Sequence, residues 1–203
     1  MQSGRTANQL NSLGDGEAWL AERDPVLRMV IAAQNERWPS VRTEDPIWGL
    51  VRIVMAQQVS TKWACTIAEQ VKTAFPTIIS PARTPIPKLA ELRAFGLPER
   101  RAQSCVDLLT RADKILEKVH QACTWEHALA DIKGIGPWTL STFRVMVLRE
   151  PDVLPLADVG LERAMRNIYG ANADLQQLAE CWRPYRSVAC WYLWRTLGNR
   201  QLG

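Results

Sequence analysis

The chain has 203 residues, of which 47% are hydrophobic and 23% are charged. This length and apolar content exclude a globally disordered polypeptide and suffice for one compact domain or two small lobes. The 25 Lys and Arg outnumber the 21 Asp and Glu, and the resulting net charge of +4 permits a polyanionic partner without requiring one.

The cysteines and the lengths of the apolar runs argue against further classes of protein. There are five cysteines, an odd number, and no two are spaced as CxxC, so neither a disulfide framework nor a zinc site is expected. No stretch approaches the roughly 18 consecutive apolar residues of a membrane helix. We therefore expect a soluble protein of the reducing cytoplasm that does not act at a membrane.

Apolar residues recur at helical spacing along the chain, and no hairpin of strands is evident, so the predicted fold class is all-α with about nine or ten helices. Residues 1–16 are polar and predict a flexible tail. Asp-Pro pairs at 24–25 and 45–46 and Ser60 are typical helix starts. The predicted helical stretches are 17–34, 46–58, 61–75, a short one before Gly96, 99–119, 125–132, 137–149, 158–170, 174–182 and 184–198.

Residues 131–143, DIKGIGPWTLSTF, place a Gly-Ile-Gly step between two helical stretches. Two helices joined in this way can expose backbone N–H groups where the second helix begins, and glycine lets another backbone approach closely. Pro137 suits the first turn of that second helix, because its missing N–H would have no partner there. The step predicts either a phosphate-binding hairpin or a simple tight turn.

Asp158 stands directly before another predicted helix, at 158–170. The positive end of a helix dipole favours an ionised carboxylate at this position. Such a residue can be an ordinary N-cap, an electrostatic catalytic group, or both.

The segment LADIKGIGPWTLSTF resembles the hairpin of the helix-hairpin-helix (HhH-GPD) DNA glycosylase superfamily. Other segments are similar to the same family: IWGLVRIVMAQQVSTKWA, LRAFGLPERRAQSCVDLL, DVLPLADVGLERA and WRPYRSVACWYLWRTLG. The resemblance covers about residues 24–198 and is strongest to the compact alkylation-repair branch, the 3-methyladenine DNA glycosylase II proteins. It implies a two-lobed helical fold, with about 45–150 in one lobe and the N-terminal segment plus 151–203 in the other.

The resemblance assigns roles to several residues. It makes Asp158 the catalytic carboxylate, in the cleft between the lobes, and it implies that Trp138 and Trp194 line the base pocket, with Trp48 and Tyr192 as further candidates. In bifunctional relatives a lysine that forms a Schiff base occupies the position of Trp138. We therefore expect a monofunctional enzyme without lyase activity.

The DNA-binding candidates lie in two segments. Gln58 matches the family's intercalating wedge, which fills the space left by a flipped base and offsets a cost of a few kcal/mol. The full set of expected DNA-binding residues is Gln57, Gln58, Ser60, Lys133, Gly134, Ile135 and Gly136. A solvated glutamine at a helix end is the alternative for Gln58.

The expected function is removal of alkylated purines, such as 3-methyladenine and 7-methylguanine, from double-stranded DNA by a monomer. An alkylated base is cationic and leaves as a neutral species, so it needs little acid assistance, and Asp152 and Glu162 are the only nearby candidates for a second acid. No iron–sulfur cluster is expected, since only Cys181 and Cys190 lie near the C-terminus. A monovalent cation at the hairpin backbone is implied by the family, without a side-chain metal site.

Two alternatives stay open. The same scaffold can act on deaminated or etheno bases or on uracil, because Thr142 and Arg195 stand where some relatives have aromatic residues. A non-catalytic helix-hairpin-helix DNA-binding protein is the second, and a helical interaction domain without DNA is disfavoured by the hairpin and the basic charge together.

Overall fold

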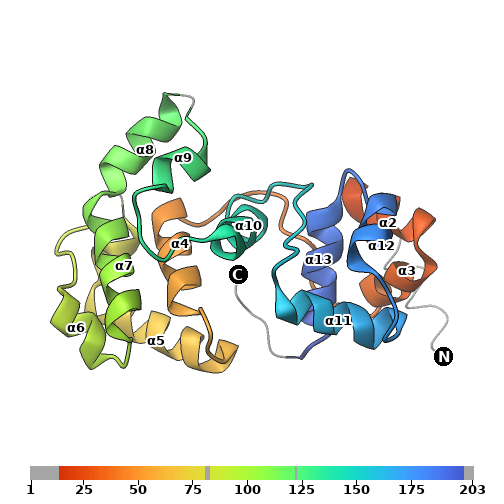
Figure 1. Ribbon diagram of the computed structural model, residues 1–203, viewed down its shortest axis with the longest axis horizontal. Coiled ribbons are helices and arrows are strands. Elements are labelled where there is room, and N and C mark those ends of the chain that lie inside the picture. The colour runs from red at the N-terminus through yellow and green to blue at the C-terminus, as the bar shows by residue number, and fades with distance from the viewer. Residues whose placement is uncertain (1–13, 81–82, 122, 199–203) are drawn as a thin grey trace. The chain divides into compact units, whose positions relative to one another are not determined.

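The structure, a computed structural model, describes residues 14–80, 83–121 and 123–198, and within these ranges the elements are helices joined by loops, without a β-strand. Contacts divide the chain into two compact units (Figure 1). Unit 1 contains the described residues up to Arg42 and from Arg144 onward, and unit 2 contains Thr43–Phe143. The expected tail, 1–16, lies mostly outside the described residues, but its last two residues belong to the first helix.

Unit 1 is built around α13, Arg186–Arg195. Eight consecutive residues of this helix, from Ser187 to Trp194, are buried, so it is covered on all sides rather than on one face. It packs against α2 (Asp15–Arg23), α3 (Pro25–Ala32) and α11 (Val159–Tyr169), and α12 (Leu175–Cys181) completes the unit (Figure 1).

Unit 2 is built around α4, Pro46–Met55, which is buried except at Arg52. It packs against α7 (Glu99–Thr110) and α5 (Thr61–Ala74). The 3-10 helix η1 (Pro76–Ile79) and the helices α6 (Leu89–Ala94), α8 (Ala112–His120) and α9 (Trp125–Leu129) complete the unit, and α10 (Pro137–Met146) begins in it.

Local chemistry sets most of the helix starts. The Asp24 carboxylate accepts hydrogen bonds from the backbone N–H groups of Val26 and Leu27 and so begins α3, with Pro25 as its first residue. Asp45 begins α4 and Ser60 begins α5 in the same way. The Asp-Pro pairs and the serine thus start helices as the sequence predicts.

Two predicted helices are broken in the structure. The stretch 17–34 divides at Asp24, where the Asp-Pro pair predicts a helix start, and the extended backbone of this residue (φ −129°, ψ 100°) ends α2. The stretch 99–119 divides at Arg111, which leaves helical geometry (φ −99°, ψ 8°) between α7 and α8. None of the described helices combines the length and the apolar character needed to cross a lipid bilayer.

Candidate functional site

Asp158 is the N-cap residue of α11 and is 4% exposed. Its Oδ1 atom accepts a hydrogen bond from the backbone N–H of Leu161, one turn into the helix. The same oxygen accepts a hydrogen bond from the indole N–H of Trp194, at 3.0 Å. Two fixed donors and the helix N-terminus therefore surround this carboxylate, an arrangement that stabilises negative charge and restricts rotation of the group.

The partner helix α13 supplies more than the indole. Cys190 is fully buried in α13, and its thiol lies close enough to Asp158 for the charge of the carboxylate to act on it. Burial raises the pKa of the Cys190 thiol, and the negative charge of Asp158 raises it further. The thiol therefore stays protonated and adds no second negative charge beside the carboxylate.

Both acids considered as a second catalytic group are ion-paired with arginines. Asp152 holds the guanidinium of Arg186 at 2.6 Å and that of Arg183 at 3.4 Å. Burial raises the pKa of Asp152, but the hydrogen bonds and charge of Arg186, with the charge of Arg183, outweigh it, so the pKa is lowered overall. Glu162 is ion-paired with Arg166 on the next turn of α11.

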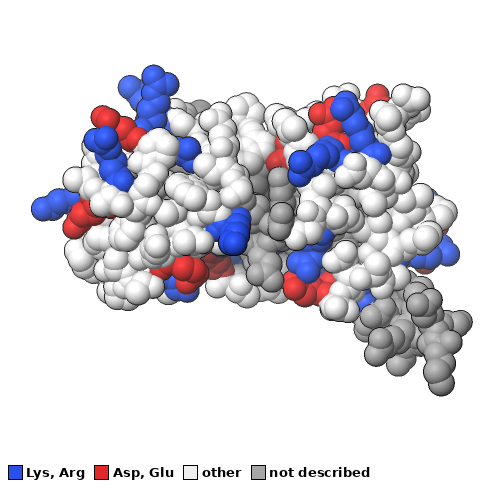
Figure 2. All heavy atoms as spheres, turned by 90° about the horizontal axis from the view of Figure 1, so that it is seen from below, with Lys and Arg blue, Asp and Glu red and all other residues white. Residues whose placement is uncertain are grey.

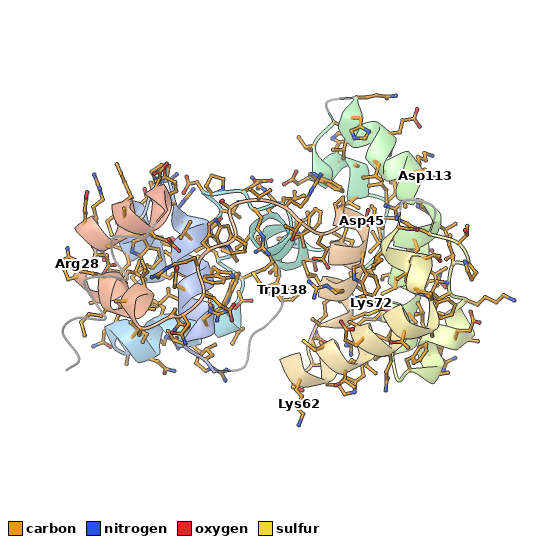
Figure 3. The ribbon with its side chains drawn as sticks, turned by 180° about the vertical axis from the view of Figure 1, so that it is seen from behind. Arg28, Asp45, Lys62, Lys72, Asp113 and Trp138 are labelled. Carbon is orange, nitrogen blue, oxygen red and sulfur yellow. The ribbon has the colours of Figure 1, made fainter. Side chains whose placement is uncertain are left out.

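The four tryptophan and tyrosine candidates occupy different environments. Trp194 and Tyr192 are buried in α13 of unit 1, and the Tyr192 hydroxyl donates to the buried carboxylate of Glu17. Trp48 is buried in α4 of unit 2. Trp138 is half-buried in the first turn of α10 (Figure 3). Of the four, the structure brings Trp194 into contact with Asp158, and the assignment of all four rings to a base pocket stays a prediction.

The Gly-Ile-Gly step forms a turn that places its two glycines in unlike surroundings. Gly134 has φ +88°, in the left-handed region that glycine alone adopts at little cost, and a Cβ atom there would lie 2.7 Å from the Ser104 hydroxyl oxygen. A Cβ atom on Gly136 would meet no atom within 4 Å. The first glycine is thus required by backbone and packing, while the second leaves open space in front of the N-terminus of α10.

Side chains of the hairpin and of the Gln57–Gln58 turn lie at the surface of unit 2. Lys133 and Gln58 are exposed, and Gln58 has φ 56°, a strained value for a residue with a side chain. Ile135 is half-buried. Ser60 caps α5 through the backbone N–H of Trp63, at 3.3 Å. Their contacts with DNA stay a prediction.

Hydrogen bonds join these two segments. The amide nitrogen of the Gln57 side chain donates to the carbonyl oxygen of Gly134 and to the hydroxyl of Thr139, both at 2.9 Å. No motif in the sequence assigns a role to Thr139, Ser104 or Arg101, although the last two lie in the segment LRAFGLPERRAQSCVDLL, which resembles the family. Only their place beside the turn and the hairpin reveals one.

Within the described ranges, no three or more His, Cys, Asp and Glu side chains form a group that could hold a metal ion. Of the two cysteines near the C-terminus, Cys190 is buried and Cys181 is exposed. The expected absence of an iron–sulfur cluster, and the monovalent cation at the hairpin, stay predictions.

Comparison with known proteins places this geometry in context. The family model described as "HhH-GPD superfamily base excision DNA repair protein" matches residues 51–187. A Mycobacterium tuberculosis (strain H37Rv) protein described as "Probable bifunctional transcriptional activator/DNA repair enzyme AlkA" is 35% identical over 191 residues, which cover 86% of this chain and 38% of that protein. The chain therefore spans about two fifths of the length of that relative.

A protein sequence and a solved structure from Schizosaccharomyces pombe match over most of their own length. DNA-3-methyladenine glycosylase 1 is 26% identical over 175 residues, which cover 77% of this chain and 75% of that protein. The solved structure of 3-methyladenine DNA glycosylase Mag1 in complex with abasic DNA has a TM-score of 0.72 and 23% identity, and the match covers 91% of this chain and 97% of that one. At this identity the likeness shows the fold.

Proposed function

The chain belongs to the HhH-GPD superfamily of base excision DNA repair proteins, and on that premise we propose that it is a monofunctional DNA glycosylase for alkylated purines. The enzyme flips 3-methyladenine or 7-methylguanine out of duplex DNA and hydrolyses the bond between the base and deoxyribose, leaving an abasic site. The observation that carries the proposal is the buried carboxylate of Asp158, fixed by Leu161 and Trp194 at the N-terminus of α11.

The reaction needs a negative charge beside the sugar. As the bond between C1′ and the base nitrogen breaks, positive charge develops on the sugar, and a fixed carboxylate stabilises it. The electron pair of that bond leaves with the base, and water then bonds to C1′ and loses a proton to the solvent. Asp158 supplies the charge and can orient the water, and its two donors hold it in place without reorganisation during the reaction.

The surroundings of the two candidate partner acids favour a particular substrate class. Asp152 and Glu162 both form ion pairs with arginines, and no contact described for the site places either side chain beside Asp158 as a free acid. A purine alkylated on a ring nitrogen already carries a positive charge and departs as a neutral molecule. The residues present suit such a cationic base better than a neutral one, which needs acid assistance to leave.

Trp138 bears on which group acts as the nucleophile and on whether the DNA strand is cleaved. It offers no amine at the position where a Schiff base would form, so water is the nucleophile and the strand is not cleaved. Its half-buried ring at the start of α10, and an electron-rich indole in general, favour stacking with a cationic base.

Binding to DNA depends on the hairpin and the N-terminus of α10. The open space at Gly136 lets a phosphate approach the backbone N–H groups there, and a monovalent cation can bridge the hairpin carbonyls and the phosphate. Basic and acidic side chains are interspersed over the face shown in Figure 2 rather than gathered by sign. Local backbone contacts at the hairpin support the binding, which weakens with salt.

The proposal also includes the binding partner, the oligomeric state, the cofactors and the location of the protein. The partner is double-stranded DNA that contains damaged bases, the protein acts as a monomer, and no iron–sulfur cluster takes part. Because the substrate is chromosomal, the protein works in the cytoplasm, at the nucleoid if its source is bacterial.

The substrate class is tested by release of free bases from duplex DNA. Duplexes carrying 3-methyladenine, 7-methylguanine, hypoxanthine, ethenoadenine or uracil are incubated with the enzyme, and released bases are separated by chromatography. We expect release of the two methylated purines, and no covalent complex on reduction with borohydride. Release of uncharged lesions alone, or a trapped complex, would contradict the proposal.

A further inference from the structure

Gln57 lies between the two DNA-binding segments of unit 2. Its backbone belongs to the turn that follows α4 and carries Gln58, while its side chain reaches a segment 77 residues further along the chain. There its amide nitrogen donates to the carbonyl oxygen of Gly134 in the hairpin and to the hydroxyl of Thr139 in α10, both at 2.9 Å. An amide nitrogen has two N–H donors, and both are used inside the protein.

Helix α7 holds the same two segments from one side. The Arg101 guanidinium donates to the Gln57 carbonyl oxygen at 2.7 Å and to the Met55 carbonyl oxygen at 3.4 Å. One turn further along α7, the Ser104 hydroxyl contacts the carbonyl oxygen of Lys133 at 2.7 Å. Because residues three apart share a helix face, α7 is a common platform for the turn and the hairpin.

These contacts fix the direction of the hairpin backbone. The carbonyl oxygens of Lys133 and Gly134 are held by Ser104 and Gln57 respectively. In a planar trans peptide the C=O and the N–H point in opposite directions, so the N–H of Gly134 is turned away from Ser104. The donors that orient the hairpin thus also orient a group that a phosphate can accept from.

The turn on the other side is strained. Gln58 has φ 56°, a left-handed backbone conformation that costs free energy in a residue with a side chain. The hydrogen bonds that hold its neighbour Gln57 from α7 and from the hairpin prevent the turn from relaxing. The hydrogen bonds of Gln57 to the hairpin therefore also determine how far the exposed Gln58 side chain projects from the surface of unit 2.

We propose that Gln57 is a positioning residue that couples the phosphate-binding hairpin to the Gln58 wedge, rather than a residue that contacts DNA itself. Through this coupling, a phosphate bound at the hairpin fixes how far the wedge enters the duplex, and insertion of the wedge fixes the hairpin. The inference rests on the proposed function, because it takes the hairpin and Gln58 as DNA-binding groups.

The test is a double-mutant cycle on the full chain with Gln57→Met, Gln58→Ala and the double variant. Methionine keeps the length of glutamine but removes both donors. Gln103→Met is the matched control, because Gln103 is exposed on α7 and bonds only Asp107 on its own helix at 2.8 Å. Affinity is measured for an undamaged duplex and for the same duplex with a tetrahydrofuran abasic-site analogue.

The ratio of the two affinities measures insertion of the wedge independently of catalysis. General damage to the fold weakens binding to both duplexes equally and leaves this ratio unchanged. We expect Gln57→Met and Gln58→Ala each to lower the ratio by about tenfold, as loss of a few hydrogen bonds allows, and the double variant to lower it no further. Gln103→Met should match the wild type.

Three results would overturn the coupling. They are a Gln57→Met variant with the wild-type ratio, a double variant whose ratio falls by the product of the two separate effects, and a wild type that does not prefer the abasic analogue. The proposed function fails separately, if the wild type prefers the abasic analogue but releases no alkylated base. Both proposals are supported if the excision rates of the four proteins follow the affinity ratios.

Discussion

Replacement of Trp194 by phenylalanine tests whether the indole N–H positions Asp158, the carboxylate that we propose is catalytic. The change keeps an aromatic ring and removes the donor that lies 3.0 Å from Oδ1 of Asp158. Hydrogen bonds to charged groups contribute about 1.5–3 kcal/mol. Since each 1.36 kcal/mol corresponds to a tenfold change in rate, we expect excision to slow by about ten- to a hundredfold.

Unit 1 contains a matched control for this variant. Trp182 is also fully buried, and its indole N–H donates at 2.8 Å to Asp24, which caps α3 as Asp158 caps α11. Trp182→Phe removes the same volume and the same kind of hydrogen bond. It should therefore destabilise the protein by a similar amount while the excision rate of the folded enzyme stays near the wild-type value.

The assay is single-turnover release of 3-methyladenine at a temperature where circular dichroism shows each variant folded. The reasoning would be refuted if Trp194→Phe excised at the wild-type rate, since the hydrogen bond would then have no part in catalysis. It would also be refuted if Trp182→Phe slowed excision equally, since the effect would then follow from a loosened core.

Four further substitutions follow from the geometry. Gln58→Gly removes the strain of φ 56°, so the free energy of unfolding in urea titrations should rise by about 1 kcal/mol. The same variant has no side chain to insert into the duplex, so base flipping measured by 2-aminopurine fluorescence should be lost. Gly134→Ala should lower the thermal midpoint and the affinity for duplex DNA, because its Cβ would lie 2.7 Å from a serine oxygen, whereas Gly136→Ala should leave the midpoint unchanged. Burial raises the pKa of Asp152, but Arg186 outweighs this effect and the pKa is lowered overall. The ionised carboxylate therefore stabilises the fold above the unfolded pKa of about 3.9. This stabilisation is lost as the pH falls through the lower pKa of the folded state. Asp152→Asn should accordingly lower the thermal midpoint at pH 7, this loss should shrink as the pH is lowered below about 3.9, and a loss that does not change with pH would contradict this.

Much of the fold could be predicted because its signals are local. An aspartate or serine before an apolar periodic run begins a helix through its own side chain, and the structure shows this at Asp24, Asp45 and Ser60. The break at Arg111 carries no comparable signal, because neither glycine nor proline marks it. Local sequence therefore predicts the helix starts better than the interruptions within a long amphipathic stretch.

The candidate site shows where sequence reasoning ends. Asp24 and Asp158 are both buried N-cap aspartates that accept an indole N–H, although Asp24 also accepts the Tyr169 hydroxyl, and in the sequence only family resemblance separates them. Which of the nine tryptophans reaches which aspartate depends on packing of helices far apart in the chain. The bond from Gln57 to Gly134 spans 77 residues for the same reason, and no spacing in the sequence indicates it.

The central claim is that Asp158 stabilises the cationic sugar, and the measurement that tests it most directly compares the wild type with Asp158→Asn. Release of 3-methyladenine from methylated duplex DNA is measured beside affinity for an abasic-site analogue. Asparagine retains an oxygen that can accept the hydrogen bonds from Leu161 and Trp194, so the fold and DNA binding should persist while release falls to background. An Asp158→Asn enzyme as active as the wild type would show that Asp158 is only a helix cap and that another group carries the reaction.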